Sequence, residues 1–190
     1  MHIVALCGSP RPRGNTATLL EAMLDGAREA GADVTRFDLA ALDVKGCRAC
    51  EACLPSAEAK CVQRDDMSTI LEALRTADAW VLGTPVYYSH LSGHLKLAID
   101  RMYSFWTTEG GWKLGLTGKR RGAVVVVQAD AEEETPRAVA DYLVTMLEWH
   151  EAEVVGRLAL SGLGGPGDAA ARPELLAQAR EIGTNLVRGA

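Results

Sequence analysis

The chain begins MHIVALCGSPRPRGNT (residues 1–16), an apolar run followed by a short turn and the start of an amphipathic segment. Ile3–Leu6 contains no polar residue, which predicts a strand buried on both faces. Gly8 and Pro10 end that strand, and apolar residues then recur at helical spacing from Thr16 to Ala30. A buried strand that leads through one short loop into a helix predicts an α/β fold.

Strand-like and helix-like segments alternate in the same way along the rest of the chain. Further strands are predicted at residues 32–39, 79–83, 122–128 and 154–160, and further helices at 65–74, 91–105, 135–149 and 173–187. Five strands that alternate with five helices predict a doubly wound, five-stranded parallel sheet with helices on both faces, a three-layer α/β/α arrangement. We expect one domain over residues 1–190.

Two segments do not fit this alternation. Residues 44–62 are too rich in cysteine to be plain core, and residues 103–119 form a long loop with two tryptophans and several glycines. Long loops in a compact domain are usually functional, so both are candidate parts of a site.

Composition excludes several classes of function. The formal net charge is −5, and the only basic clusters, Arg11/Arg13 and Lys119–Arg121, are short, which argues against a nucleic-acid partner. We expect no signal peptide, because the first apolar run stops at Cys7, and no membrane span, because no apolar stretch is long enough. Five cysteines without an export signal indicate a reducing compartment, so we expect a cytoplasmic protein whose cysteines are thiols or metal ligands.

Polar groups gather where the first strand meets the first helix. The hydroxyls of Ser9 and Thr16, the amide of Asn15 and the free N–H groups of the helix start converge there, and Arg11 or Arg13 adds positive charge. In an open parallel sheet, ligands bind beyond the carboxyl ends of the strands, and a helix start of this kind binds a phosphate monoester without a metal. The alternative is an ordinary strand-to-helix turn with Asn15 as N-cap.

Three other phosphate-binding motifs do not match. The loop has neither the GxxxxGK[ST] pattern of a nucleoside triphosphatase nor the GxGxxG pattern of a dinucleotide site. Cys7-x5-Arg13 has the spacing of a cysteine-dependent phosphatase, but Pro10 and Pro12 remove N–H groups from the cradle, and Gly14 stands where that family has Ser or Thr. We therefore expect Cys7 to be a buried core thiol.

Two motifs together resemble one family. Gly8-Ser-Pro-Arg-x-x-Gly-Asn-Thr16 is similar to the phosphate loop of the NADPH-dependent FMN reductase and multimeric flavodoxin family. Gly83-Thr-Pro-Val-Tyr-Tyr-Ser89, followed by Leu91–Lys96 and Asp100-Arg101, resembles that family's second flavin-contacting segment. The motifs follow the first and third predicted strands, and the resemblance covers nearly the whole chain.

The resemblance implies a flavodoxin-like fold with strand order 2-1-3-4-5, an FMN cofactor and NAD(P)H as co-substrate. It also implies a homodimer or homotetramer, in which the region of Gly93 and the following helix forms the subunit contact. Hydride transfer to flavin needs no side-chain acid or base, so no catalytic residue is assigned, and His90 and His94 are expected at the surface or an interface. The implied FMN-binding residues are Ser9, Arg11, Asn15, Thr16, Ala17, Pro85, Val86, Tyr87, Tyr88 and Ser89.

One loop departs from the family pattern. The third flavin loop of the family follows the fourth strand and is usually glycine-rich, whereas residues 128–134 read QADAEEE. Three glutamates at a helix start suit the helix dipole and need no further function. Contacts from this loop to a flavin are therefore not assigned.

Four cysteines form the most unusual motif of the sequence, Cys47-x2-Cys50-x2-Cys53-x7-Cys61. Three cysteines at successive x2 spacings with a fourth further on can ligate a [4Fe–4S] cluster. Zinc also accepts four thiolates, although structural zinc sites usually pair two separated C-x2-C units, and plain or redox-active thiols are the third alternative. The spacing resembles the iron–sulfur flavoproteins, and the resemblance implies a cluster loop that follows the second strand and lies beside the flavin.

Two functions remain open from the sequence. The first is an enzyme in which FMN takes a hydride from NAD(P)H and the electrons pass to a quinone, another small molecule or a protein acceptor. The second is a non-enzymatic carrier that exchanges electrons between protein partners, as short-chain flavodoxins do. The loop 103–119 favours the enzyme, because Trp106 and Trp112 could stack on a second ligand or seal the flavin pocket.

Overall fold

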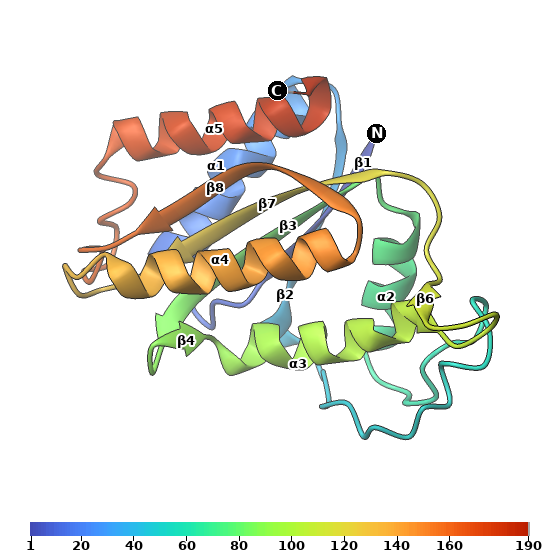
Figure 1. Ribbon diagram of the computed structural model, residues 1–190. Helices are drawn as coiled ribbons and strands as arrows, with labels where there is room; N and C mark the ends of the chain where they lie inside the picture. Colours follow the sequence, from blue (N-terminus) through green and yellow to red (C-terminus); the bar gives the residue numbers. More distant parts are fainter. Residues whose placement is uncertain (190) are drawn as a thin grey trace.

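Five parallel strands form the centre of the molecule (Figure 1), which a computed structural model describes for residues 1–189. Their order is β2-β1-β3-β7-β8, which is the predicted 2-1-3-4-5 topology. The strands are β1 (His2–Cys7), β2 (Asp33–Asp38), β3 (Ala79–Tyr87), β7 (Arg120–Val127) and β8 (Ala152–Leu160). The helices are α1 (Asn15–Glu29), α2 (Met67–Thr76), α3 (Gly93–Arg101), α4 (Glu134–Trp149) and α5 (Pro173–Arg188), with short 3-10 turns η1 (Leu39–Ala41) and η2 (Met102–Phe105).

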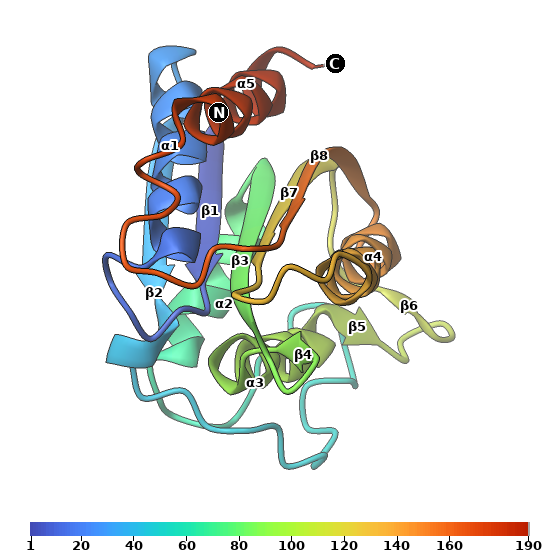
Figure 2. The same cartoon turned by 90° about the vertical axis from the view of Figure 1, so that its left-hand side faces the viewer.

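Helices cover both faces of the sheet, as Figure 2 shows, with α1 and α5 on one side and α3 and α4 on the other. Ile3 and Ala5 of β1 belong to the core on the side of α1 and α5, whereas Val4 and Leu6 belong to the core on the side of α2, α3 and α4. Successive side chains of a strand point to opposite faces, so a strand with two covered faces must be apolar throughout. This explains why β1, β3 and β7 could be predicted from unbroken apolar runs, whereas the edge strand β2, which reads DVTRFD, alternates.

Helices α1 and α5 lie in close contact because each has a glycine where the other helix crosses it. A Cβ atom on Gly183 would lie 1.8 Å from the carbonyl oxygen of Met23, and one on Gly26 would lie 2.1 Å from the carbonyl oxygen of Arg180. Real Cβ contacts are never this short, so the crossing requires glycine at both positions. The crossing fixes α5, and with it the loop that precedes α5, against α1.

Three short strands were not predicted. β4 (His90–Leu91) pairs with the end of β3, and β5 (Trp106–Thr107) and β6 (Lys113–Leu114) form a hairpin within the loop 103–119. The helix predicted at 91–105 is shorter: Ser92 caps α3 by accepting a hydrogen bond from the N–H of Leu95, and the chain tightens into η2 after Arg101. Two-residue strands leave no alternation to read, which is why the sequence did not show them.

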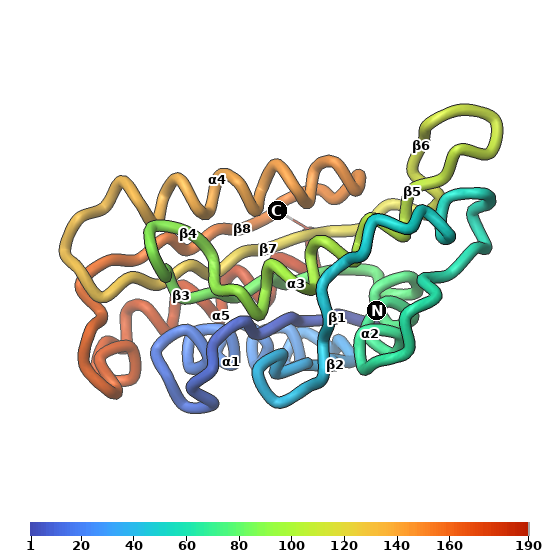
Figure 3. Tube along the Cα trace, turned by 90° about the horizontal axis from the view of Figure 1, so that it is seen from below, coloured from blue at the N-terminus to red at the C-terminus, as the bar shows by residue number. Residues whose placement is uncertain are grey.

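The two long loops, residues 44–64 and the segment that contains the β5–β6 hairpin, lie away from the loops that follow the central strands. In Figure 3 the loop 44–64 runs beside the β5–β6 hairpin, far from the loops that follow β1, β3 and β8. Within residues 1–189, no helix is long and apolar enough to span a bilayer.

Candidate functional site

A cavity of about 650 Å³ opens at the carboxyl ends of the central strands. Four segments build it: the loop after β1, the end of β3, the loop after β7 and the loop after β8. Its walls are formed by Ser9, Pro10, Arg11, Pro12, Arg13, Gly14, Asn15, Thr16, Pro85, Val86, Tyr87, Val127, Ala129, Leu163, Gly164, Gly165 and Pro166. This is the topological switch point of the sheet, where ligands of doubly wound folds bind.

The loop after β1 offers unpaired donors to this cavity. Gly14 takes the N-cap position without a side-chain cap, and Thr18 donates the first intrahelical bond, to the carbonyl oxygen of Gly14. The N–H groups at the start of α1 consequently lack intrahelical acceptors. Arg11 and Arg13 are exposed, and neither has a carboxylate within 4.0 Å in residues 1–189. The site therefore has two uncompensated positive charges beside free N–H groups.

Gly8 joins the loop after β1 to β3 and to Ser92 through its backbone N–H and its carbonyl oxygen. Its N–H donates to the carbonyl oxygen of Gly83 at 2.7 Å, and its carbonyl oxygen accepts from Ser92 Oγ at 2.7 Å. A Cβ atom on Gly8 would lie 2.7 Å from Ser92 Oγ and 2.8 Å from Leu95 Cβ, so no larger residue fits. The first and third strand ends are thereby held in fixed register around the cavity.

Asn15 has a different role from the one that its position in the motif suggests. Its Nδ2 donates to the carbonyl oxygens of Leu163 and Gly165, each at 2.9 Å, and its Oδ1 accepts from the N–H of Ala169 at 3.0 Å. Both amide hydrogens are therefore used within the protein. Asn15 is not the N-cap of α1, and its side chain holds the loop after β8 at the cavity wall.

The ten predicted flavin residues divide into two groups. Seven line the cavity: Ser9, Arg11, Asn15, Thr16, Pro85, Val86 and Tyr87. The methyl group of Ala17 is buried in the core, although its N–H belongs to the free helix start. Tyr88 and Ser89 form the exposed turn between β3 and β4 with left-handed φ values of 48° and 58°, outside the cavity wall.

The family resemblance gives one glycine-rich loop at the flavin, whereas here the loops after β7 and β8 each form part of the cavity wall. Val127 and Ala129 line the cavity, whereas Glu132, Glu133 and Glu134 are exposed at the start of α4. The glycine-rich wall comes from Gly164–Pro166 after β8, residues that were not among the predicted site residues. The turn-forming run SGLGGPG at 161–167 was the signal that could have found it.

The burial of Cys7 and the placement of Trp106 and Trp112 answer two questions that the sequence left open. Cys7 is fully buried, and burial raises the pKa of its thiol, so the thiol is neutral and cannot serve as a phosphatase nucleophile. Trp106 and Trp112 stack on each other with ring centroids 5.5 Å apart in the β5–β6 hairpin and take no part in the cavity wall. The expectation that they seal the flavin pocket was wrong for this chain, because the hairpin lies at the other end of the sheet.

The cysteine motif lies in a loop closed at its base and held at its tip. At the base, a buried ion pair joins Asp65 to Arg101 of α3, with N–O distances of 2.7 and 3.1 Å, and Arg101 also donates to the carbonyl oxygen of Lys45 at 2.9 Å. At the tip, the carbonyl oxygen of Leu54 accepts from the N–H of Thr108 and from the hydroxyls of Thr107 and Thr108. Between these anchors the loop has no helix or strand.

The four thiols share this loop but do not meet at one point. Cys47 and Cys50 are exposed, and Cys53 and Cys61 are half-buried. Burial raises the pKa of Cys53, and the charges of the neighbouring Cys61, Cys47 and Cys50 act in the same direction. Within the described part of the chain, no three His, Cys, Asp or Glu side chains converge on a position for a metal ion.

Comparison with known proteins identifies the family. Residues 1–164 match the family described as NADPH-dependent FMN reductase. The chain belongs to this family.

Several members named iron–sulfur flavoprotein are similar to the chain. One from Archaeoglobus fulgidus is 33% identical over 148 residues, which cover 78% of this chain and 63% of that protein. One from Methanosarcina thermophila is 35% identical over 101 residues, which cover 53% of this chain and 52% of that protein. The matched segments span between 48% and 64% of the length of these relatives.

Solved structures show the same fold. An NAD(P)H:quinone oxidoreductase from Methanothermobacter marburgensis superposes with a TM-score of 0.75 at 23% identity, covering 98% of each chain. An FMN-dependent NADH-azoreductase from Bacillus anthracis, solved with FMN, gives a TM-score of 0.70 at 14% identity over 98% of this chain and all of that one. Both support the flavodoxin-like topology.

The cavity fits the FMN of the NADPH-dependent FMN reductase family. Free helix N–H groups and the guanidinium groups of Arg11 and Arg13 match a phosphate dianion. Pro85, Val86 and Val127 supply apolar cover for a flat ring, and about 650 Å³ lies in the range of cofactor pockets.

The cysteine loop fits an iron–sulfur cluster by its donor set. All four thiols lie between the two anchors, and the N–H of Ala49 donates to Cys47 Sγ at 3.4 Å, the kind of bond that stabilises a thiolate. Ala49 and Glu51, which lie between the first cysteines, have left-handed φ values of 50° and 56° and turn the loop sharply. Closing the four sulfurs onto one cluster requires the loop to tighten.

Proposed function

We propose that this chain is an FMN-dependent oxidoreductase that takes a hydride from NAD(P)H and delivers electrons to a quinone, another small molecule or a protein acceptor. The observation that carries the proposal is the cavity at the carboxyl ends of β1, β3, β7 and β8, with unpaired donors at its base. Family membership supports the same chemistry. Residues 1–190 are proposed to act as one FMN-binding domain.

Each segment has a defined task in this proposal. Ser9, Arg11, Thr16 and the N–H of Ala17 bind the FMN phosphate, while Asn15 holds the loop after β8 in place. Pro85, Val86 and Tyr87 lie along the ring. FMN supplies the hydride acceptor, so the protein contributes binding and orientation and no acid–base residue is required.

The four cysteines Cys47, Cys50, Cys53 and Cys61 are proposed to ligate a [4Fe–4S] cluster. The support is the spacing of the motif, the anchoring of the loop and the similarity to proteins named iron–sulfur flavoproteins. A cluster supplies one-electron exchange with an acceptor. The chain is also proposed to form a homodimer or homotetramer, as the family resemblance implies.

The first test is cofactor binding and reduction. Mass spectrometry of the released cofactor should show FMN, and anaerobic NADPH should bleach the flavin without an added reductase. Thr16→Val keeps the methyl group that faces Gly83 but removes the hydroxyl, so FMN affinity should fall about tenfold or more. Thr18→Val is the matched control on the same helix and should leave the affinity unchanged, because Thr18 is outside the cavity wall.

The contrary outcomes are distinct. Release of FAD, or unchanged FMN affinity in Thr16→Val, would contradict the assignment of the phosphate loop. Flavin that stays oxidised with both NADH and NADPH would favour the electron carrier over the enzyme.

The second test addresses the cysteines. In anaerobically purified protein, Cys→Ser at any of the four positions should lose most of the iron, because each thiolate supplies one corner of the cluster. Cys7→Ala is the control and should keep its iron, because Cys7 is buried in the core on the α1 side of the sheet. Wild-type protein without iron, or with stoichiometric zinc instead, would overturn the cluster.

A further inference from the structure

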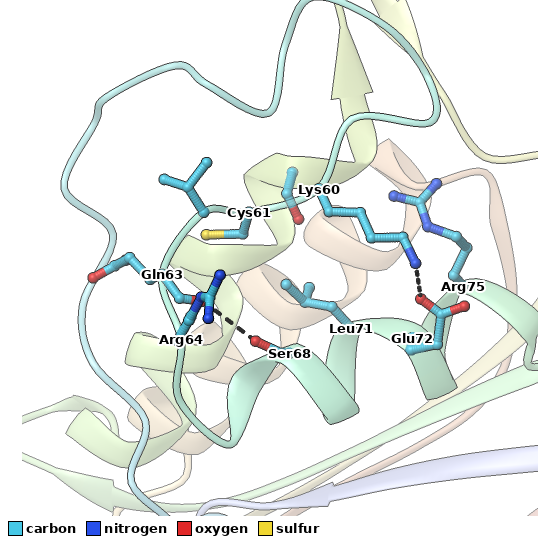
Figure 4. A pocket seen from close by; sticks show the side chains of 10 residues that line it. Lys60, Cys61, Gln63, Arg64, Ser68, Leu71, Glu72 and Arg75 are labelled. Atoms are coloured by element: carbon cyan, nitrogen blue, oxygen red, sulfur yellow. Dashed lines mark hydrogen bonds and ion pairs between the residues drawn. The ribbon is translucent and has the colours of Figure 1, made fainter.

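A second cavity, of about 480 Å³, lies between the end of the cysteine loop, helix α2 and the turn η2 (Figure 4). It shares no wall residue with the flavin cavity. Cys61 and Arg64 come from the loop, Leu71 and Arg75 from α2, and Ser104 from η2. Segments distant in sequence therefore form one concave site.

The charge of this site is positive. Lys60 Nζ and Glu72 Oε2 lie 2.8 Å apart and form an ion pair, drawn as a dashed line in Figure 4. Their charges therefore cancel. Arg64 and Arg75 have no carboxylate within 4.0 Å among residues 1–189. Figure 4 shows Arg64 and Arg75 at opposite ends of the cavity, so each offers its charge to a different part of a ligand, and Arg is the side chain best suited to bind a planar anion.

The rest of the wall is preorganised. Arg75 is fixed by a hydrogen bond to the carbonyl oxygen of Ala57 at 3.2 Å and by its position over the Phe105 ring, 5.3 Å from the centroid. Ser104 is only 5% exposed and lines the cavity. Leu71 adds a buried apolar surface.

We propose that this cavity binds a small organic anion with a flat, apolar body, such as an aromatic sulfonate or carboxylate. The anionic group is bound by Arg64, the apolar body lies against Leu71, and Arg75 at the far end of the cavity adds positive charge. Because Cys61 forms part of the wall, the bound anion contacts the cysteine motif. The site is separate from the flavin cavity and belongs to the open form of the cysteine loop that the structure shows, so the inference does not rest on the proposed flavin chemistry.

Calorimetric titration of the FMN-loaded full chain tests this inference. The probe is naphthalene-2-sulfonate, compared with the uncharged naphthalene-2-sulfonamide at constant salt. The sulfonate should bind, and the sulfonamide should bind about tenfold more weakly, because it lacks the charge. Arg64→Gln should weaken sulfonate binding about threefold to tenfold, and Glu72→Gln should strengthen it by a similar factor, because Lys60 is then released.

Arg48→Gln is the matched control. Arg48 is an exposed arginine of the same loop that does not line the cavity, so its replacement changes the net charge equally. Sulfonate binding should then change less than about twofold, as expected for a charge outside the site. Arg13→Gln, in the flavin cavity, should likewise have no effect.

Three outcomes overturn the inference. These are absence of sulfonate binding, equal weakening by Arg48→Gln and Arg64→Gln, and loss of binding only in Arg13→Gln, which would place the probe beside the flavin. None of these measurements requires turnover, so a failure here is distinguishable from a failure of the flavin chemistry.

Discussion

The flavin cavity and the cysteine loop are two candidate sites built on opposite principles. The flavin cavity is formed by the ends of hydrogen-bonded strands, and Gly8 joins two of these ends through bonds of 2.7 Å. The cysteine loop has no regular secondary structure and depends on two anchors, the Asp65–Arg101 pair and the carbonyl oxygen of Leu54. The sheet thus holds the walls of the flavin cavity in place, whereas no regular element brings the four thiols together in the described part of the chain.

The largest expected effect comes from breaking the base anchor. Both side chains of the Asp65–Arg101 pair are fully buried, so Asp65→Asn leaves Arg101 as a buried charge without its counterion. The free energy of unfolding should fall by about 3–5 kcal/mol, measured by denaturant titration. Iron content should fall as well, because Arg101 also fixes the start of the loop at Lys45.

Asp100→Asn is the control for that experiment. Asp100 pairs with Lys96 on the exposed side of the same helix, and such pairs contribute about 0–1 kcal/mol. Equal destabilisation by the two variants would mean that the buried pair does not anchor the loop.

The second expected effect lies in the flavin cavity. Asn15→Ala removes three hydrogen bonds to the loop after β8, each contributing about 1 kcal/mol, so FMN affinity should fall about tenfold or more. Limited proteolysis of the FMN-free variant should show faster cleavage within residues 161–172 than in the wild type. Weaker FMN binding without faster cleavage would mean that Asn15 acts by direct contact with the phosphate instead.

The third effect concerns the pH dependence of stability, which we expect to come from the buried His150 beside Trp106 of the β5–β6 hairpin. His150 is 5% exposed, with the rings of Trp80, Phe105 and Trp106 around it, and burial, together with the nearby Arg120 cation, lowers its pKa. Its pKa in the unfolded chain is near 6.5, so the unfolded state binds the proton more readily. This contribution to stability is complete above that pH and is lost as the pH falls below it.

His150→Phe should therefore reduce the pH dependence of stability between pH 7 and pH 5, by up to about 1.4 kcal/mol per pH unit. Denaturant titrations at several pH values measure this slope. His90→Phe is the control, because His90 is exposed and should leave the slope unchanged. Identical slopes in wild type and His150→Phe would show that His150 is not held neutral.

The smallest effect separates two adjacent tyrosines. Tyr88 is fully exposed with φ of 48°, whereas Tyr87 lines the flavin cavity. Tyr88→Gly should change FMN affinity less than about threefold and raise stability by about 0.5–1 kcal/mol, because glycine adopts this conformation without strain. Tyr87→Ala, measured by the same flavin-fluorescence titration, should weaken FMN binding more than Tyr88→Gly does. The reverse order would place the flavin ring against the turn and not against β3.

The sequence by itself determined the sheet and the short loop that leads from the first strand into the first helix. Both depend on local signals: strands with two covered faces must be apolar throughout, as in Ile3–Leu6, and a strand that turns at Gly8 into a helix exposes N–H groups whatever surrounds it. Glycines and prolines mark these turns in the chain. The strand order 2-1-3-4-5 came from the resemblance, and the structure confirmed it.

Only the tertiary structure decided which distant segments of the chain contact the sheet, the loop after β1 and the cysteine loop. The partners of the Asn15 side chain lie about 150 residues further along the chain, and those of Asp65 lie 20 and 36 residues away, so no local pattern records either contact. The placement of Trp106 and Trp112 away from the flavin cavity depends on the length and crossing of α3, and the cavity beside Cys61 depends on three segments meeting. The sequence gives the chemistry of each side chain. A site also depends on the distances between segments, and the packing of the folded chain sets those distances.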